Sequence, residues 1–173
     1  MSSGRPQAGE YAAYAQADLD QVPGDDAVAA LEAVELETLA LLAPLGETAA
    51  DHRYAPGKWS VRQILGHLID DERIFVYRAL CVARGDTQPL PGFDENDYMR
   101  LAGFETRPWA DLLEEYRAVR QSTLAFFRGL PSDAWPRRGT VNGYPASVRG
   151  LAFHIAAHEL HHLRVLRERY LPA

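Results

Sequence analysis

The stretch of sequence that decides the fold is Ser60-Val-Arg-Gln-Ile-Leu-Gly-His-Leu-Ile-Asp-Asp-Glu-Arg-Ile-Phe-Val-Tyr-Arg-Ala-Leu-Cys-Val-Ala-Arg84. Ser60 and Gln63, three residues apart, form the capping-box pattern typical of a helix start. Apolar residues follow at the spacing of one helix face, namely Val61, Ile64, Leu65, Leu68, Ile69, Phe75 and Leu80. Gly85 is typical of the position just past a helix end. The pattern therefore predicts a helix over about residues 60–84.

Three further segments show helical spacing of apolar residues: 25–43, 106–129 and 147–170. No segment shows the alternation of apolar and polar residues that predicts a strand. Four helices of about 19 to 25 residues predict an all-α fold, a four-helix bundle. We expect this bundle to occupy residues 25–173, with residues 1–24 as a partly helical N-terminal extension.

The connection between the second and third predicted helices is long. It covers residues 85–106, contains the acidic stretch Asp94-Glu95-Asn96-Asp97, and ends at Thr106, the expected cap of the third helix. Loops of this length are often functional lids, although a solvated surface loop is the simpler interpretation. Fully extended, it would span about 70 Å, whereas the second helix is about 37 Å long. The chain can therefore return along the bundle, which makes the second and third helices parallel and the second and fourth antiparallel.

The composition indicates a soluble globular protein of 173 residues. Hydrophobic residues make up 47% and charged residues 24%, which excludes disordered, collagen-like and coiled-coil chains. The net charge of −6 and the scattered basic residues predict no nucleic-acid partner. No apolar run approaches the roughly 18 residues of a membrane span, and the N-terminus lacks the apolar core of a signal peptide. The single Cys81 cannot form an intramolecular disulfide, so we expect a cytoplasmic location.

Four histidines lie within nine residues of the last predicted helix: His154, His158, His161 and His162. At 100° per residue, His158 and His162 fall within the apolar stripe, one helical turn apart, as a metal-binding pair requires. His154 and His161 fall on the flank of this stripe. The pattern predicts that His158 and His162 point into the bundle.

A third ligand is expected from His67, on the second helix. His67 lies about 10 Å from the start of the second helix, and His162 lies about 12 Å from the end of the fourth. If these helices are antiparallel, the two histidines lie at the same height in the bundle. Three neutral imidazoles would bind Zn²⁺, Ni²⁺ or Fe²⁺ and leave a coordination position for water or substrate. Asp70 and Asp71 could accept a hydrogen bond from an imidazole N–H of a ligand.

The stretch His158-Glu-Leu-His-His162 also matches the HExxH motif of zinc proteases, in which the glutamate is the general base. The places of the further glycine and histidine of metzincins are taken by Val165 and Glu168, and no sheet is predicted that could bind a peptide. A protease is therefore not expected, and Glu159 is interpreted as a solvent-facing helix residue. A di-iron carboxylate site is also excluded, because the sequence has only one Glu-x-x-His.

Several blocks of the sequence, in this order and spacing, resemble the DinB-like superfamily over nearly the whole chain. They are the run from Tyr54 to Phe75 with its Gly-Lys-Trp-Ser and Gly-His elements, Tyr77-Arg-Ala-Leu, Ala83-Arg-Gly-Asp86, Leu90-Pro-Gly-Phe-Asp94 and Ala157-His-Glu-Leu-His-His-Leu. The resemblance implies an up-down-down-up four-helix bundle with a divalent metal, often nickel or zinc, held by His67, His158 and His162. It also implies that a homodimer is possible and that the reaction resembles those of thiol-dependent S-transferases and isomerases.

Two hypotheses follow for the function. The first is a divalent-metal-dependent enzyme acting on a small-molecule substrate, either a low-molecular-weight-thiol S-transferase or a hydrolase. Its metal would lower the pKa of a bound thiol or water. The second is a stress-associated metal-binding bundle without turnover, in which the histidines serve stability.

Overall fold

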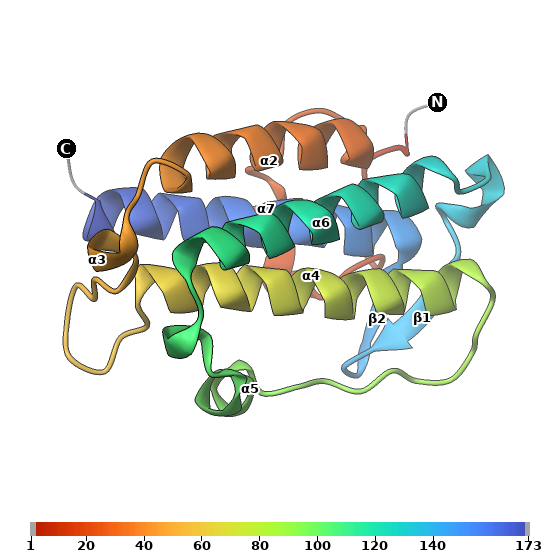
Figure 1. The fold of residues 1–173 in the computed structure, drawn as a ribbon. Helices are drawn as coiled ribbons and strands as arrows, with labels where there is room; N and C mark the ends of the chain where they lie inside the picture. The colour runs from red at the N-terminus through yellow and green to blue at the C-terminus, as the bar shows by residue number, and fades with distance from the viewer. Residues whose placement is uncertain (1–2, 172–173) are drawn as a thin grey trace.

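Four long helices dominate the computed structural model, which describes residues 3–171. In chain order, the elements are the 3₁₀ turn Ala13–Ala15 (η1), α1 (Gln16–Leu19), α2 (Ala27–Leu42), α3 (Glu47–Ala50), α4 (Val61–Ala83), α5 (Glu95–Ala102), the 3₁₀ turn Phe104–Thr106 (η2), α6 (Trp109–Arg128), the 3₁₀ turn Ser132–Ala134 (η3), β1 (Arg138–Val141), β2 (Tyr144–Ser147), α7 (Val148–Val165) and a π-helical turn, Leu166–Tyr170 (η4). Helices α2, α4, α6 and α7 lie side by side as a bundle (Figure 1). The four predicted helices are therefore confirmed, each within a few residues of its expected ends.

Side-chain caps fix where several of these helices begin. Ser60 accepts a hydrogen bond from the backbone N–H of Gln63, whose side chain bonds back to the Ser60 N–H, so the predicted capping box of α4 is present. Ser147 caps α7 through the N–H of Gly150. The expected cap of α6 is wrong: Thr106 lies in the preceding 3₁₀ turn, and the position before the helix is occupied by Pro108.

Contacts between side chains show the relative directions of the helices. The residues of α4 contact residues of α7 whose numbers fall as those of α4 rise: His67 contacts His162, Asp71 contacts His158, and Phe75 contacts His154. Helices α4 and α7 are therefore antiparallel. Near the start of α4, Arg62 donates to the backbone oxygen of Arg107, just before α6. Further along α4, Glu72 pairs with Arg120 of α6. Helices α4 and α6 therefore run in the same direction, opposite to α2 and α7 (Figure 1).

A small hairpin corrects the expectation that the chain contains no strand. Strands β1 and β2 pair antiparallel, with Val141 opposite Tyr144. The two residues between them, Asn142 and Gly143, both have positive φ, which is the requirement of a tight hairpin turn with this dipeptide. Strands of four residues are too short to show a clear alternation in sequence.

The long connection between α4 and α6 is also more ordered than expected. It contains α5, followed by the turn η2. The side chain of Asp94 accepts hydrogen bonds from the backbone N–H groups of Asn96 and Asp97 at the start of α5. The acidic stretch is therefore partly a helix start, where carboxylates are favoured by the helix dipole. In Figure 1, α5 lies alongside α4 on the outside of the bundle.

Residues before α2 pack onto the bundle as well. Arg5 donates to the backbone oxygens of Leu19, Val22 and Gly24, and Glu10 is fully buried against Arg149 of α7. The partly helical character expected for this segment is seen in η1 and α1. The predicted boundaries also include residues 1–2 and 172–173, which lie outside the described residues.

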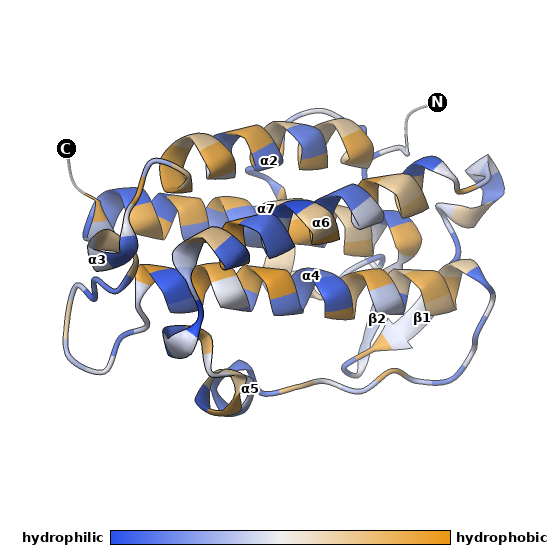
Figure 2. Cartoon of the chain, in the orientation of Figure 1, coloured by the Kyte–Doolittle hydropathy of each residue, from blue (hydrophilic) through white to orange (hydrophobic). Residues whose placement is uncertain are grey.

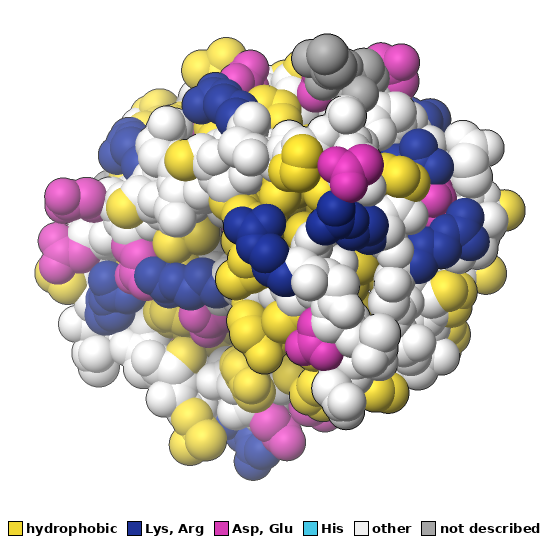
Figure 3. All heavy atoms as spheres, turned by 90° about the vertical axis from the view of Figure 1, so that its right-hand side faces the viewer, with side chains coloured by type: hydrophobic (Ala, Val, Ile, Leu, Met, Phe, Trp, Pro, Cys, Tyr) yellow, Lys and Arg dark blue, Asp and Glu magenta, His cyan; other side chains and the backbone are white. Residues whose placement is uncertain are grey.

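The distribution of polar and apolar residues fits a bundle around one core. Figure 2 shows hydrophobic residues along all four long helices, and buried hydrophobic side chains from each of these helices belong to one core cluster. On the face shown in Figure 3, acidic and basic side chains are interspersed without a broad patch of either sign. Within the described part of the chain, no helix combines the length and apolar character needed to cross a membrane.

Candidate metal centre

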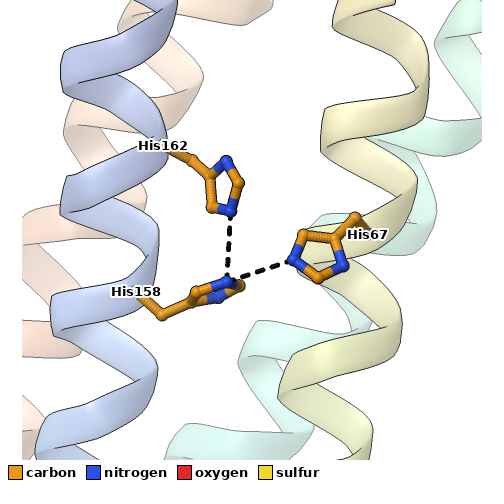
Figure 4. Close-up of side chains that lie close together, drawn as sticks. All are labelled: His67, His158 and His162. Atoms are coloured by element: carbon orange, nitrogen blue, oxygen red, sulfur yellow. Dashed lines mark hydrogen bonds between the residues drawn. The ribbon is translucent and has the colours of Figure 1, made fainter. Parts of the chain in front are cut away.

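The structure brings together the three histidines that the sequence singled out. The Nε2 atom of His158 lies 3.1 Å from Nε2 of His67 and 3.1 Å from Nε2 of His162. One ring nitrogen from each of the three residues lies within 4.8 Å of the other two. As Figure 4 shows, His158 and His162 come from successive turns of α7, and His67 faces them from α4. The antiparallel packing of α4 and α7 therefore produces the cluster.

The spacing of these nitrogens suits a single metal ion. Two nitrogens bound to one ion at about 2.1 Å lie roughly 3.0 to 3.4 Å apart for octahedral to tetrahedral angles. Two of the three separations, both 3.1 Å, fall within this range, and the nitrogens of the third pair, His67 and His162, lie within 4.8 Å of each other. Three imidazoles are also a donor set of known zinc, nickel and iron sites. The residues present therefore fit a divalent transition metal.

Burial favours the neutral, metal-binding form of two of the histidines. Burial and the neighbouring His158 lower the pKa of His67 to about 4. Burial, with His158 and His67 nearby, lowers the pKa of His162 to about 2. Near neutral pH, both rings are therefore uncharged and carry a free lone pair.

His158 differs because a carboxylate lies against its other ring nitrogen. Its Nδ1 is 3.2 Å from Oδ2 of Asp71, which is itself buried. Burial acts to lower the pKa of His158, but the Asp71 charge outweighs it, so the pKa is raised. A carboxylate at Nδ1 directs Nε2 toward a metal and increases the basicity of the ring. Of the two aspartates proposed for this role, Asp71 is in place, whereas Asp70 is partly exposed and lies 3.9 Å from Arg73.

Glu159 corrects the expectation of a solvent-facing residue. Its side chain is buried and accepts hydrogen bonds from Thr38, Tyr116 and Arg120, which also pairs with Glu72. The prediction considered only the helical angle from His158, whereas side chains of α2 and α6 reach Glu159 inside the bundle. The carboxylate is therefore turned into the bundle, away from the position that a general base of an HExxH site would need.

A pocket of about 460 Å³ opens beside the histidines and includes His158 and His162 in its wall. Part of the opposite wall comes from the N-terminal segment through Tyr11, Tyr14 and Asp18, and another part from the hairpin. Sequence reasoning missed these contributions, because nothing in an isolated polar-aromatic segment indicates which helix it will cover. Glu95 of the acidic stretch also lines the pocket, as a substrate-facing element would.

The two flanking histidines lie in the same pocket without joining the cluster. The ring of His154 stacks on Phe75 at 4.1 Å, and burial lowers its pKa to about 4. His161 is partly exposed, with Nδ1 3.4 Å from Asp18. The sixth histidine, His52, packs edge-on against Tyr170 and does not line the pocket.

Together, the fold and site define a four-helix bundle protein with a three-histidine candidate metal centre at the edge of a pocket. The chain matches the DinB superfamily over residues 30–166 and belongs to this family.

Among solved structures, the chain is similar to YfiT from Bacillus subtilis, with a TM-score of 0.70 and 18% sequence identity. The similarity covers 91% of this chain and 86% of that protein, which is described as a probable metal-dependent hydrolase with an unusual four-helix bundle topology. No curated protein matches the chain.

Proposed function

We propose that this protein is a divalent-metal-dependent enzyme whose metal is bound by His67, His158 and His162. The observation that carries the proposal is the convergence of three Nε2 atoms beside a pocket of about 460 Å³. Pockets of this size accommodate small organic molecules. The low pKa values of two of the rings and the carboxylate on the third support metal binding near neutral pH.

A divalent ion held there would lower the pKa of a thiol or water molecule and supply a nucleophile near neutral pH. Asp71 fixes the ring of His158 through its Nδ1, so that Nε2 faces the other two histidines. Trp59 packs against His67, with 5.0 Å between ring centroids, and restricts the orientation of that ring. The aromatic walls of the pocket exclude water from part of a bound substrate.

Two reaction classes remain within this proposal, hydrolysis and transfer of a low-molecular-weight thiol. The fold shared with YfiT supports a comparison with that probable hydrolase, and the family resemblance supports thiol transfer. Zinc and nickel are the metals that we propose first, with iron as a further candidate, since all three accept imidazole ligands. The competing proposal is a metal-binding bundle without turnover, and the presence of the pocket argues against it.

The first experiment is elemental analysis of untagged wild-type protein beside His67→Ala and His158→Ala, with His52→Ala as a matched control. We expect about one transition-metal ion per chain in wild type and His52→Ala, and a strong loss in the other two variants. Wild-type protein that contains no metal and binds no added Zn²⁺ or Ni²⁺ would refute the proposal.

A second experiment separates the candidate functions. The metal-loaded protein is tested against ester and amide substrates, and against electrophiles with and without a low-molecular-weight thiol. Turnover that needs both metal and thiol supports the transferase, and turnover that needs metal alone supports the hydrolase. If neither occurs while His67→Ala lowers the melting temperature, the non-catalytic bundle is supported instead.

Several finer expectations are part of the same proposal. The order in which residues of α4 contact those of α6 and α7 supports an up-down-down-up arrangement of the bundle. We propose that residues 25–173 form the DinB-like bundle and that residues 1–24 are an extension to it. We further propose a cytoplasmic protein that is able to form a homodimer, which sedimentation analysis would test.

A further inference from the structure

The buried arginines of this protein differ in their partners. Of the residues that the structure describes, three arginines are buried: Arg62, Arg78 and Arg120. Arg62 pairs with Glu47 and Asp51, and Arg120 with Glu72 and Glu159. Within residues 3–171, no carboxylate lies within ion-pair distance of Arg78, although this side chain is only 4% exposed. A buried charge without a counter-charge is unfavourable, so the exception needs an explanation.

The position of Arg78 explains this exception, because its side chain lines the same pocket as His158 and His162. One guanidinium nitrogen, Nη2, donates to the backbone oxygen of Pro91 at 2.8 Å. The guanidinium carbon lies 4.7 Å from the ring centroid of Phe75 and 5.6 Å from that of Phe93. A guanidinium group has five N–H donors, and among residues 3–171 only this one hydrogen bond engages them. Donors therefore remain for a ligand between two aromatic rings.

The acidic residues of the pocket wall have other partners or lie in solvent. Glu10 is bound by Arg149, Asp71 by His158, and Asp18 by His161. Glu95 is exposed, so solvent and salt screen its charge. The charge of Asp71 acts favourably on Arg78, but this carboxylate lies against His158. Within the described residues, the wall therefore leaves the guanidinium group without a direct ion pair.

We propose that Arg78 is the anion-binding subsite of this pocket and receives a carboxylate group of the substrate. The inference rests on the proposed function only in placing the substrate in this pocket. Arg78 lies seven residues after Asp71 on α4, about 10 Å along the helix axis. A substrate bound in this way has its carboxylate several bonds away from the atom that reacts at the histidines. Its middle portion lies against Phe75 and His154, which favours an apolar or aromatic group.

The test compares two probes of nearly the same shape, the anion 3-phenylpropionate and its neutral amide 3-phenylpropanamide. Their dissociation constants are measured by calorimetry or NMR titration for the wild type, Arg78→Gln and Arg78→Lys. Arg84→Gln, an exposed arginine of the same helix end, is the matched control. Each protein is measured as purified and after removal of metal by a chelator, so that binding of the carboxylate to a metal is distinguished from binding to Arg78.

In metal-free protein, we expect the wild type and Arg84→Gln to prefer the carboxylate over the amide by about 10-fold or more, the scale of hydrogen bonds to charged groups. Arg78→Gln should lose this preference while binding the amide as before, and Arg78→Lys should retain part of it. Equal binding of both probes by the wild type would overturn the proposal. So would an equal loss of both in Arg78→Gln with the preference unchanged, because Arg78 would then only hold the Pro91 segment in place. Failure of the metal proposal would appear in elemental analysis and would leave this comparison unaffected.

Discussion

The hydrogen bond between Asp71 and His158 gives the sharpest prediction about the candidate metal centre. Asp71 Oδ2 lies 3.2 Å from His158 Nδ1, and its side chain is 7% exposed, so water cannot readily replace it. Carboxylates in this position typically contribute 10- to 100-fold to metal affinity. Asp71→Asn keeps an acceptor oxygen but removes the charge, so we expect a loss of about 10-fold, or about 1.4 kcal/mol. Asp71→Ala removes both, and we expect about 100-fold, or about 2.7 kcal/mol.

The assay is competition for Zn²⁺ and for Ni²⁺ between the protein and a chromophoric chelator at fixed pH. Asp70→Asn is the matched control, because this neighbouring carboxyl is partly exposed and faces Arg73 rather than a histidine. Its metal affinity should stay within about twofold of wild type, in the range of an exposed substitution. Circular dichroism checks that all variants are folded. An affinity of Asp71→Ala within twofold of wild type would refute the assigned role of Asp71.

Three further substitutions test the packing around the site, each by urea unfolding. Glu159→Ala should lower the free energy of unfolding by about 3 to 5 kcal/mol, since three buried donors lose their acceptor, whereas the exposed control Glu168→Ala should change it by less than about 0.5 kcal/mol. Glu10→Gln should cost about 2 kcal/mol at pH 7. Burial raises the pKa of Glu10, but hydrogen bonds outweigh this effect and lower the pKa below its ordinary 4.5, so the difference from wild type should shrink as pH falls below 4.5; a constant difference would contradict this reasoning. Gly66→Ala should destabilise the protein by about 1 to 2 kcal/mol, because its Cβ would lie 2.4 Å from the Phe104 ring; unchanged stability would show that the ring moves freely.

The helices and two of the inward histidines were predictable from local patterns. The capping box at Ser60 and the apolar spacing after it define α4 before any tertiary contact is considered. His158 and His162 are separated by one helical turn, so their common direction follows from helix geometry alone. To place His67 beside them, the prediction also needed the relative directions of the helices, which were inferred from the length of the connection over residues 85–106.

Other parts of the molecule depend on which surfaces meet. The carboxylate of Glu159 is buried in the bundle, where its three donors come from Thr38 of α2 and from Tyr116 and Arg120 of α6. The hairpin and α5 were not predicted, because short elements are stabilised by the surface on which they pack. The pocket wall formed by Tyr11 and Tyr14 likewise exists only once the N-terminal segment lies on α7.

The sequence by itself determined the long helices, the capping box of α4 and the common direction of His158 and His162. These features follow from periodicities of a few residues, which any helix of this composition expresses. Only the tertiary structure decided which charges are neutralised and which are left for a ligand. Arg78 and Arg120 look equivalent in the sequence, yet Arg120 is enclosed by two carboxylates, whereas Arg78 lines a pocket. That distinction depends on pairs such as Arg120 and Glu72, 48 positions apart along the chain, which only the packing of the helices brings into contact.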